Sequence, residues 1–305
     1  MDYFDELLYH EIMTIYYGNE FSTERTEEFE TVMNQLRDIL SQEESISTKK
    51  RAKELLLHIY DVLEYYEEDL EGGIETMEGI LVQNEISWFS ALIFATSGIS
   101  VDIPKSIQAS VLLMPFTITD SVKSFIKGFS LKIKNACKNL LNTSLFTSAS
   151  KEQLLENFET VMSGLKKNLA TETQTMVKSF VDNTQNQIKR ANPKVFTGYK
   201  WCSILDSRTC DVCADLDGSV YNTIGDAPFS PIHYRCRCQL IGFFQEEAEP
   251  DWTTFSDWVE KIPEEKQIDV LGKKRFELWK NGDLKIKDFV NDGHKIKLED
   301  LYNKE

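Results

Sequence analysis

The segment of residues 199–238 decides the fold, and it reads YKWCSILDSRTCDVCADLDGSVYNTIGDAPFSPIHYRCRC. Five of the chain's six cysteines lie within it. A C-x2-C pair is followed, after nineteen residues, by the pattern H-x2-C-x-C, and together they supply Cys210, Cys213, His233, Cys236 and Cys238. A C-x2-C turn places two thiolates on the same side of a tight loop, which is the usual first half of a tetrahedral zinc site. The segment therefore predicts a zinc module.

Five candidate ligands compete for four positions around this metal. One interpretation uses the four cysteines, and another lets His233 replace one of them; the spacing leaves both open. Either set fills every position with protein atoms, so the zinc has a structural role. The nearby Arg208, Arg235 and Arg237 can offset the negative charge of the thiolates, or they can be exposed strand and turn residues. Cys202 is interpreted as a core residue.

Outside this segment the chain shows helical patterns. Apolar residues make up 41% of its 305 residues and charged residues 28%, which is enough for a buried core and excludes a disordered or fibrous chain. Apolar residues recur at helical spacing in residues 27–40 and 50–66, and Gly72-Gly73 is predicted to end the second helix. Residues 86–118 are apolar and predict short elements separated by turns.

Later helices are predicted from their start and stop signals. One begins at Thr119 or Asp120, and one begins at Ser150 with Gln153 in a capping box. A further helix spans residues 168–190 and ends before Asn192-Pro193. The cysteine-rich segment carries short strands at 199–201 and 235–244, with a turn at Asp217-Gly218.

The predicted fold class is mainly α with a small α+β, zinc-stabilised, cysteine-rich module. Four parts follow from the patterns: an acidic helical region at 1–85, a helical part at 86–198, the Cys/His module at 199–245 and a helical tail at 246–305. The tail has large apolar anchors, which are Trp252, Phe255, Trp258, Leu271, Leu278 and Trp279.

The charge of the chain is concentrated at its N-terminus. The formal net charge is −16, which argues against a protein whose whole surface grips nucleic acid. Residues 1–100 hold 6 basic and 22 acidic side chains, whereas residues 101–245 hold 17 basic and 12 acidic ones. The acidic first third is either a solvated helical surface or a contact for a basic protein partner.

Membrane insertion and secretion are not predicted. The first residues lack the basic and apolar regions of a secretory signal. The longest apolar stretch, residues 86–99, is shorter than the roughly 18 residues that a membrane span needs, and we interpret it as a buried hairpin or helix. We therefore expect the chain to fold in a reducing compartment, where the cysteines do not form disulfides.

The cysteine-rich segment resembles a known family. The order W…D-x-R-T-C-x-x-C…L-x-G…P-x-H-x-x-C-R-C, from Trp201 to Cys238, is similar to the head-morphogenesis domain of tailed-phage minor head proteins, the Mu F-like family. The helix before it carries a Thr-Glu pair at Thr171-Glu172, although Ala170 stands where an Arg is common. The tail resembles the family's W…Q…LG-x-x-R…G stretch from Trp258 to Gly282. The resemblance covers about residues 100–300.

The resemblance implies a low-copy, non-catalytic protein that acts in head (procapsid) morphogenesis at the portal vertex. Its implied partners are the portal protein and the major capsid or scaffold protein. Its implied location is the virion, with the host cytoplasm as the place of assembly. The implied parts of the head-morphogenesis domain are residues 86–198, the zinc module and the tail.

Two alternatives come from other function classes. A zinc module that binds nucleic acid inside the head is favoured by the three arginines and by the local positive charge of residues 101–245. A metal-dependent hydrolase would use the carboxylates of the same segment, which are Asp206, Asp211, Asp215, Asp217 and Asp226. Aspartates in a glycine-containing loop are most often turn formers, and the segment has no paired-carboxylate motif, so we expect no enzyme.

Overall fold

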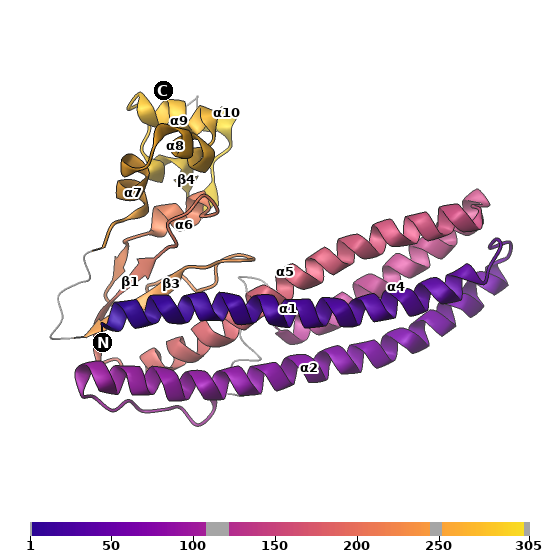
Figure 1. The fold of residues 1–305 in the computed structure, drawn as a ribbon, viewed down its shortest axis with the longest axis horizontal. Helices are drawn as coiled ribbons and strands as arrows, with labels where there is room; N and C mark the ends of the chain where they lie inside the picture. The colour runs from indigo at the N-terminus through magenta and orange to yellow at the C-terminus, as the bar shows by residue number, and fades with distance from the viewer. Residues whose placement is uncertain (1, 108–121, 245–251, 302–305) are drawn as a thin grey trace. The chain divides into compact units, whose positions relative to one another are not determined.

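A computed structural model of the protein describes residues 2–107, 122–244 and 252–301 (Figure 1). The described chain is mainly helical with small antiparallel sheets, as predicted. It divides into two compact units. The first contains Met1–Gly98, Ile103–Gln187 and Pro231–Cys236, and the second contains Ile99–Asp102, Ile188–Ser230 and Arg237–Glu305.

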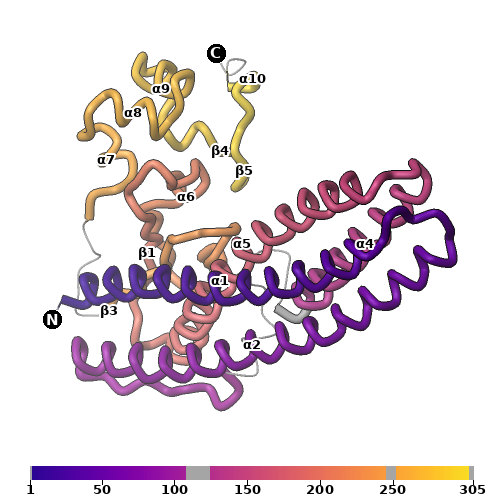
Figure 2. The backbone as a smooth tube through the Cα atoms, turned by 45° about the vertical axis from the view of Figure 1, so that its right-hand side comes forward, coloured from indigo at the N-terminus to yellow at the C-terminus, as the bar shows by residue number. Residues whose placement is uncertain are grey.

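The first unit is built from four long helices. They are α1 (Tyr3–Ser41), α2 (Lys49–Ser97), α4 (Val122–Thr147) and α5 (Lys151–Ala191), the last of which ends in the second unit. Helices α1 and α2 form an antiparallel hairpin, and α2 also packs against α4 (Figures 1 and 2). Asp2 and Thr48 cap the hairpin helices, because each side chain accepts backbone N–H bonds of the first turn.

The predicted stop at Gly72-Gly73 is wrong, because α2 continues through both glycines to Ser97. Glycine inside a helix costs about 1 kcal/mol relative to alanine, but it does not end a helix whose buried stripe continues. Leu70 and Ile74 on either side are fully buried. The apolar stretch at 86–97 is accordingly the last part of one helix, and Gly98 ends it.

Helix α5 is one element of 41 residues, where the sequence predicted two. Its predicted start is confirmed, since the Ser150 backbone N–H donates to Gln153 and the Gln153 N–H donates to the Ser150 hydroxyl. Its predicted end before Asn192-Pro193 is also confirmed. The two predicted helices join because nothing between them breaks the helix.

The predicted inward face of α4 is confirmed from Phe125 onward. Its buried members are Phe125, Ile126, Phe129, Ile133, Cys137, Leu140 and Leu141. Burial raises the pKa of the Cys137 thiol to about 12, as expected for a small apolar core residue. The predicted caps Thr119 and Asp120 lie outside the described residues. Within residues 2–107, 122–244 and 252–301, no helix is apolar over a length that would cross a membrane.

A row of polar side chains is buried along the middle of α5. Lys178 is only 4% exposed, and its ammonium group lies 2.8 Å from Glu11 and 2.6 Å from Asp182. Burial alone would lower the pKa of Lys178, but the two carboxylates raise it above its usual value. The ion pairs therefore keep the lysine charged inside the helical unit.

The second unit contains a three-stranded antiparallel sheet with the order β2-β1-β3. The strands are β1 (Phe196–Cys202), β2 (Val220–Tyr221) and β3 (Gln239–Phe244). The strand predicted at 199–201 is confirmed and longer, but the strand predicted at 235–244 begins only at Gln239. Arg235 has a φ of 59°, which is incompatible with an extended strand, so residues 235–238 approach β3 as a loop.

The C-terminal part of the second unit packs around its own apolar core. Its elements are α6 (Asp211–Leu216), α7 (Phe255–Lys261), α8 (Glu264–Leu271), α9 (Lys273–Lys280), the 3-10 helix η1 (Ile286–Phe289), β4 (Val290–Asn291), β5 (His294–Lys295) and α10 (Leu298–Leu301). Phe255, Leu271 and Leu278 are core residues as predicted, and Trp258 and Trp279 pack against them. Ala214 of α6 belongs to the same core, so the helix that follows the C-x2-C pair is held by the tail.

Candidate metal centre

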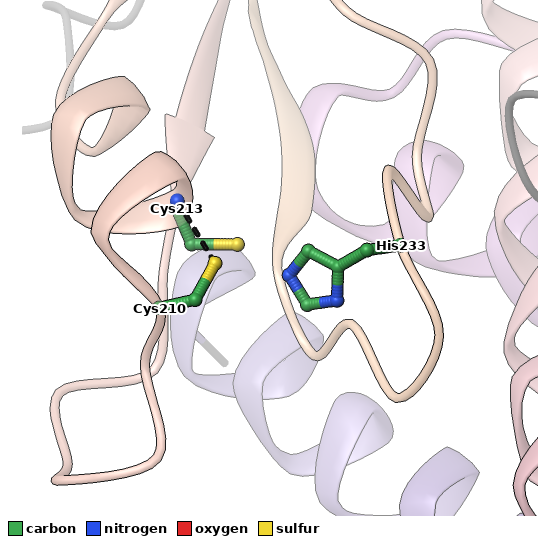
Figure 3. Close-up of side chains that lie close together, drawn as sticks. All are labelled: Cys210, Cys213 and His233. Carbon is green, nitrogen blue, oxygen red and sulfur yellow. Dashed lines mark hydrogen bonds between the residues drawn. The ribbon is translucent and has the colours of Figure 1, made fainter. Parts of the chain in front are cut away.

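The C-x2-C pair lies where a loop enters α6. Cys210 is the N-cap residue of α6, and its sulfur accepts a 3.4 Å hydrogen bond from the Cys213 backbone N–H. The helical turn therefore brings the two sulfurs to one side of the chain, as the C-x2-C spacing predicts (Figure 3). Cys213 is 2% exposed, and Cys210 is half-buried.

The five predicted ligands come together as two groups that share Cys213. The first group is Cys210, Cys213 and His233, and the second is Cys213, Cys236 and Cys238. The ligand atoms of each group all lie within 4.8 Å of one another. Zinc–sulfur bonds of about 2.3 Å in a tetrahedron separate two sulfurs by about 3.8 Å. Small side-chain movements would therefore place either group around one ion.

The imidazole of His233 faces the sulfurs of Cys210 and Cys213 from a separate loop (Figure 3). Its Nδ1 lies 2.8 Å from the carbonyl oxygen of Tyr234. A neutral imidazole that donates Nδ1–H to this carbonyl presents Nε2 as its ligand atom, which is the usual outer-sphere arrangement of a metal-bound histidine. The structure is therefore consistent with both ligand sets, the four cysteines or three cysteines with His233.

Three buried thiols of the cysteine-rich segment are not joined by disulfides. Cys213, Cys236 and Cys238 are 2%, 3% and 2% exposed, and all three are present as thiols. Thiolates in such surroundings need a compensating positive charge. A divalent cation would supply that charge, and the donor set of sulfur and imidazole is one that zinc prefers. Cys202, predicted as core, is half-buried and belongs to neither group.

An ion pair holds the loop of Cys236 and Cys238 to the loop before Cys210. The two terminal nitrogens of the Arg237 guanidinium donate to the two carboxylate oxygens of Asp206, with N–O distances of 2.6 and 2.7 Å. Arg208 binds the same carboxylate, and the Arg237 hydrogen bonds hold the pKa of Asp206 well below its usual range. Arg237, whose side chain is 15% exposed, is therefore held in this ion pair, whereas Arg208 is 77% exposed.

Sequence reasoning missed Ser203. Its hydroxyl donates to the Cys213 carbonyl at 2.8 Å and lies 3.3 Å from the Cys238 sulfur. Its backbone N–H donates to Asp217, which also accepts from the Phe255 N–H. Ser203 thus ties both cysteine loops to β1 and the tail. No sequence spacing marks a serine that supports a metal site. The sequence predicted only the neighbouring turn at Asp217-Gly218, where φ of Gly218 is 80°.

Four of the five carboxylates of the hydrolase alternative have structural partners. Asp206 binds Arg237, Asp211 lies 2.9 Å from Lys295, Asp217 caps two backbone N–H groups, and Asp226 accepts from the Thr223 hydroxyl. Burial, the largest effect on Asp215, raises its pKa. Among the described residues these carboxylates form no metal-binding group. Their contacts explain Asp206, Asp211, Asp217 and Asp226 as residues that stabilise turns and loops.

Replacing Asp206 with Asn is expected to destabilise the module by about 2 kcal/mol at pH 7, because a charge-assisted bidentate pair is lost. Folding lowers the pKa of Asp206. The contribution of its carboxylate to the free energy of unfolding is therefore complete above the unfolded pKa of about 4, and it is lost as the pH falls from there through the folded pKa. Urea unfolding from pH 7 to 3 measures this. Asp226→Asn, whose carboxylate accepts from Thr223, is the control. Equal losses for both variants, or a pH-independent loss, would contradict the role of the pair.

Comparison with known proteins identifies one family. The model of the family described as phage Mu protein F-like protein matches residues 135–241. The match covers roughly a third of the chain and includes the cysteine-rich segment and all of α5. No curated protein and no solved structure matches the chain.

Proposed function

Because residues 135–241 belong to the phage Mu protein F-like family, we propose that the chain is a minor head protein acting in head morphogenesis. The family match to the cysteine-rich segment is the observation that carries this proposal. The role is structural, since the carboxylates of that segment support the fold. The proposed place of action is the portal vertex, with the portal protein and the major capsid or scaffold protein as partners.

We further propose that zinc holds the cysteine-rich module together. Cys213 belongs to both ligand groups, so it is a ligand in either arrangement. The remaining positions come from Cys210, Cys236, Cys238 and His233, which leaves no position for a catalytic water. When bound, the ion offsets part of the negative charge of the thiolates and cross-links loops that lie far apart in the chain. The surrounding Ser203 and Arg237 contacts orient those loops.

Deleting the coding sequence from the phage tests the head function. We expect loss of infectious particles together with defective or reduced heads, and recovery when the chain is supplied from a plasmid. Mass spectrometry of purified heads from the complemented phage is expected to find the chain at low copy number relative to the major capsid protein. Normal yields of infectious heads without the chain would overturn the proposal.

A further inference from the structure

A groove runs along the α1–α2 hairpin, within the first unit. It consists of two adjoining depressions with volumes of about 610 and 430 Å³. Both are lined by Glu28 of α1 and Asp69 of α2, so they form one continuous surface feature. Val32 and Val62 contribute apolar surface, and Tyr65, which is 77% exposed, stands at the edge.

The groove carries a strong excess of negative charge. Its charged lining consists of Glu24, Glu28, Glu68, Asp69 and a single cation, Arg25. Among the described residues, neither Glu68 nor Asp69 forms a salt bridge. Burial raises the pKa of Glu28, and the neighbouring Asp69 and Glu24 raise it further against the opposing effect of Arg25. The carboxylates therefore repel one another in the absence of an added cation.

Arg25 shows which chemistry the groove accepts. Its guanidinium lies 2.7 Å from Glu28 and 5.2 Å from the centre of the Phe21 ring. It fits there because residue 73 is glycine, since a Cβ at this position would overlap the guanidinium. The chain thus already holds one cation between a carboxylate and an aromatic ring, and it keeps a glycine inside a helix where that cation lies.

A buried hydroxyl adds a second, independent indication of a ligand. Tyr66 lines the larger depression and is 4% exposed, and its hydroxyl has no hydrogen-bond partner among the described residues. Burial, and then the charge of Glu28, raise the pKa of this hydroxyl. Buried hydroxyls are normally hydrogen-bonded, so this one has an unused hydrogen-bonding capacity beside the carboxylates. An incoming ammonium or guanidinium group would satisfy it.

We propose that this groove binds a basic, amphipathic helical segment of a partner protein, with Lys or Arg side chains seated among Glu28, Glu68 and Asp69. Apolar residues of the segment would cover Val32 and Val62, and a cation beside Tyr65 would gain a cation–π contact. The chemistry of the groove is independent of the proposed function. Only the identification of the partner as a head component rests on that function.

Isothermal titration of the full chain with a 15-residue amphipathic Leu/Lys/Arg peptide tests the groove. The double variant Glu68→Gln/Asp69→Asn removes two exposed charges that line it. We expect the Kd for the peptide to rise at least about tenfold, because two cation contacts are lost. The matched control Glu64→Gln/Glu71→Gln removes the same charge from α2 outside the groove, and we expect a change below about threefold.

Two results would overturn the proposal. Equal weakening by both double variants would show a diffuse electrostatic attraction rather than a groove. Equal binding of a peptide in which every Lys and Arg is replaced by Gln would show that cations are not recognised. Neither result bears on the deletion experiment, so failure of the groove and failure of the head function are distinguishable.

Discussion

A chain carrying Cys213→Ala is expected to lose its zinc and the protease resistance of residues 199–238. Cys213 is the ligand common to both groups and is 2% exposed. Structural zinc contributes about 10–16 kcal/mol of apparent binding free energy in small modules, and a loop-rich segment has little core of its own. Metal analysis combined with limited proteolysis measures both losses.

Cys202→Ala is the matched control for this experiment. Cys202 lies in the same segment but belongs to neither ligand group. We expect this variant to keep its zinc and its resistance to proteolysis. A Cys213→Ala chain with full zinc content and unchanged proteolysis would remove Cys213 from the ligand set and with it the proposed cross-link.

Replacing Lys178 with Met is expected to destabilise the helical unit by about 3–5 kcal/mol, because Glu11 and Asp182 would lose their buried counter-charge. Glu11 is 1% exposed and Asp182 6%, so water does not take the place of the ammonium group. Urea denaturation followed by circular dichroism measures the free energy of unfolding. The expected loss is large enough to lower the yield of folded protein.

The matched control for Lys178 is Lys166→Met on the same helix. Lys166 forms an ion pair with Glu30 of α1, but both side chains are substantially exposed. Exposed pairs contribute about 0–1 kcal/mol, so we expect little change in stability. Equal losses for the two variants would contradict the interpretation that Lys178 compensates buried charge.

Local signals made the helices and the module predictable from sequence. The capping box at Ser150, the stop at Asn192-Pro193 and the apolar face that contains Cys137 depend on neighbouring residues, and all three are confirmed. The family resemblance is likewise carried by residues 199–238 and is confirmed by the match over 135–241. These features need no knowledge of tertiary contacts.

Tertiary contacts explain what the sequence did not reveal. Gly72-Gly73 looks like a stop, but Gly73 stays helical and accommodates Arg25 from another helix. Likewise, the polar middle of α5 resembles an exposed surface, yet Lys178 is buried against the carboxylate of Glu11, 167 residues away in the chain. Pairing of Asp206 with Arg237, across 31 residues, also has no local signature.

The spacing of the cysteines and His233 identified five candidate ligands but did not show which of them lie together. The sequence predicted one site with four of five ligands, and it placed Cys236 and Cys238 on a strand. In the structure Cys236 and Cys238 precede β3. Cys213 forms one group with Cys236 and Cys238 and a second group with Cys210 and His233. The backbone turn at Arg235, between His233 and Cys236, has a φ of 59° that the residue types around it do not specify.

Native mass spectrometry of the intact chain, purified without chelator, tests most directly whether an ion holds the cysteine-rich module. We expect a mass increase of one zinc ion per chain that disappears on chelation, accompanied by proteolytic sensitivity of residues 199–238. A metal-free mass under the same conditions, with a stable and protease-resistant module, would contradict it.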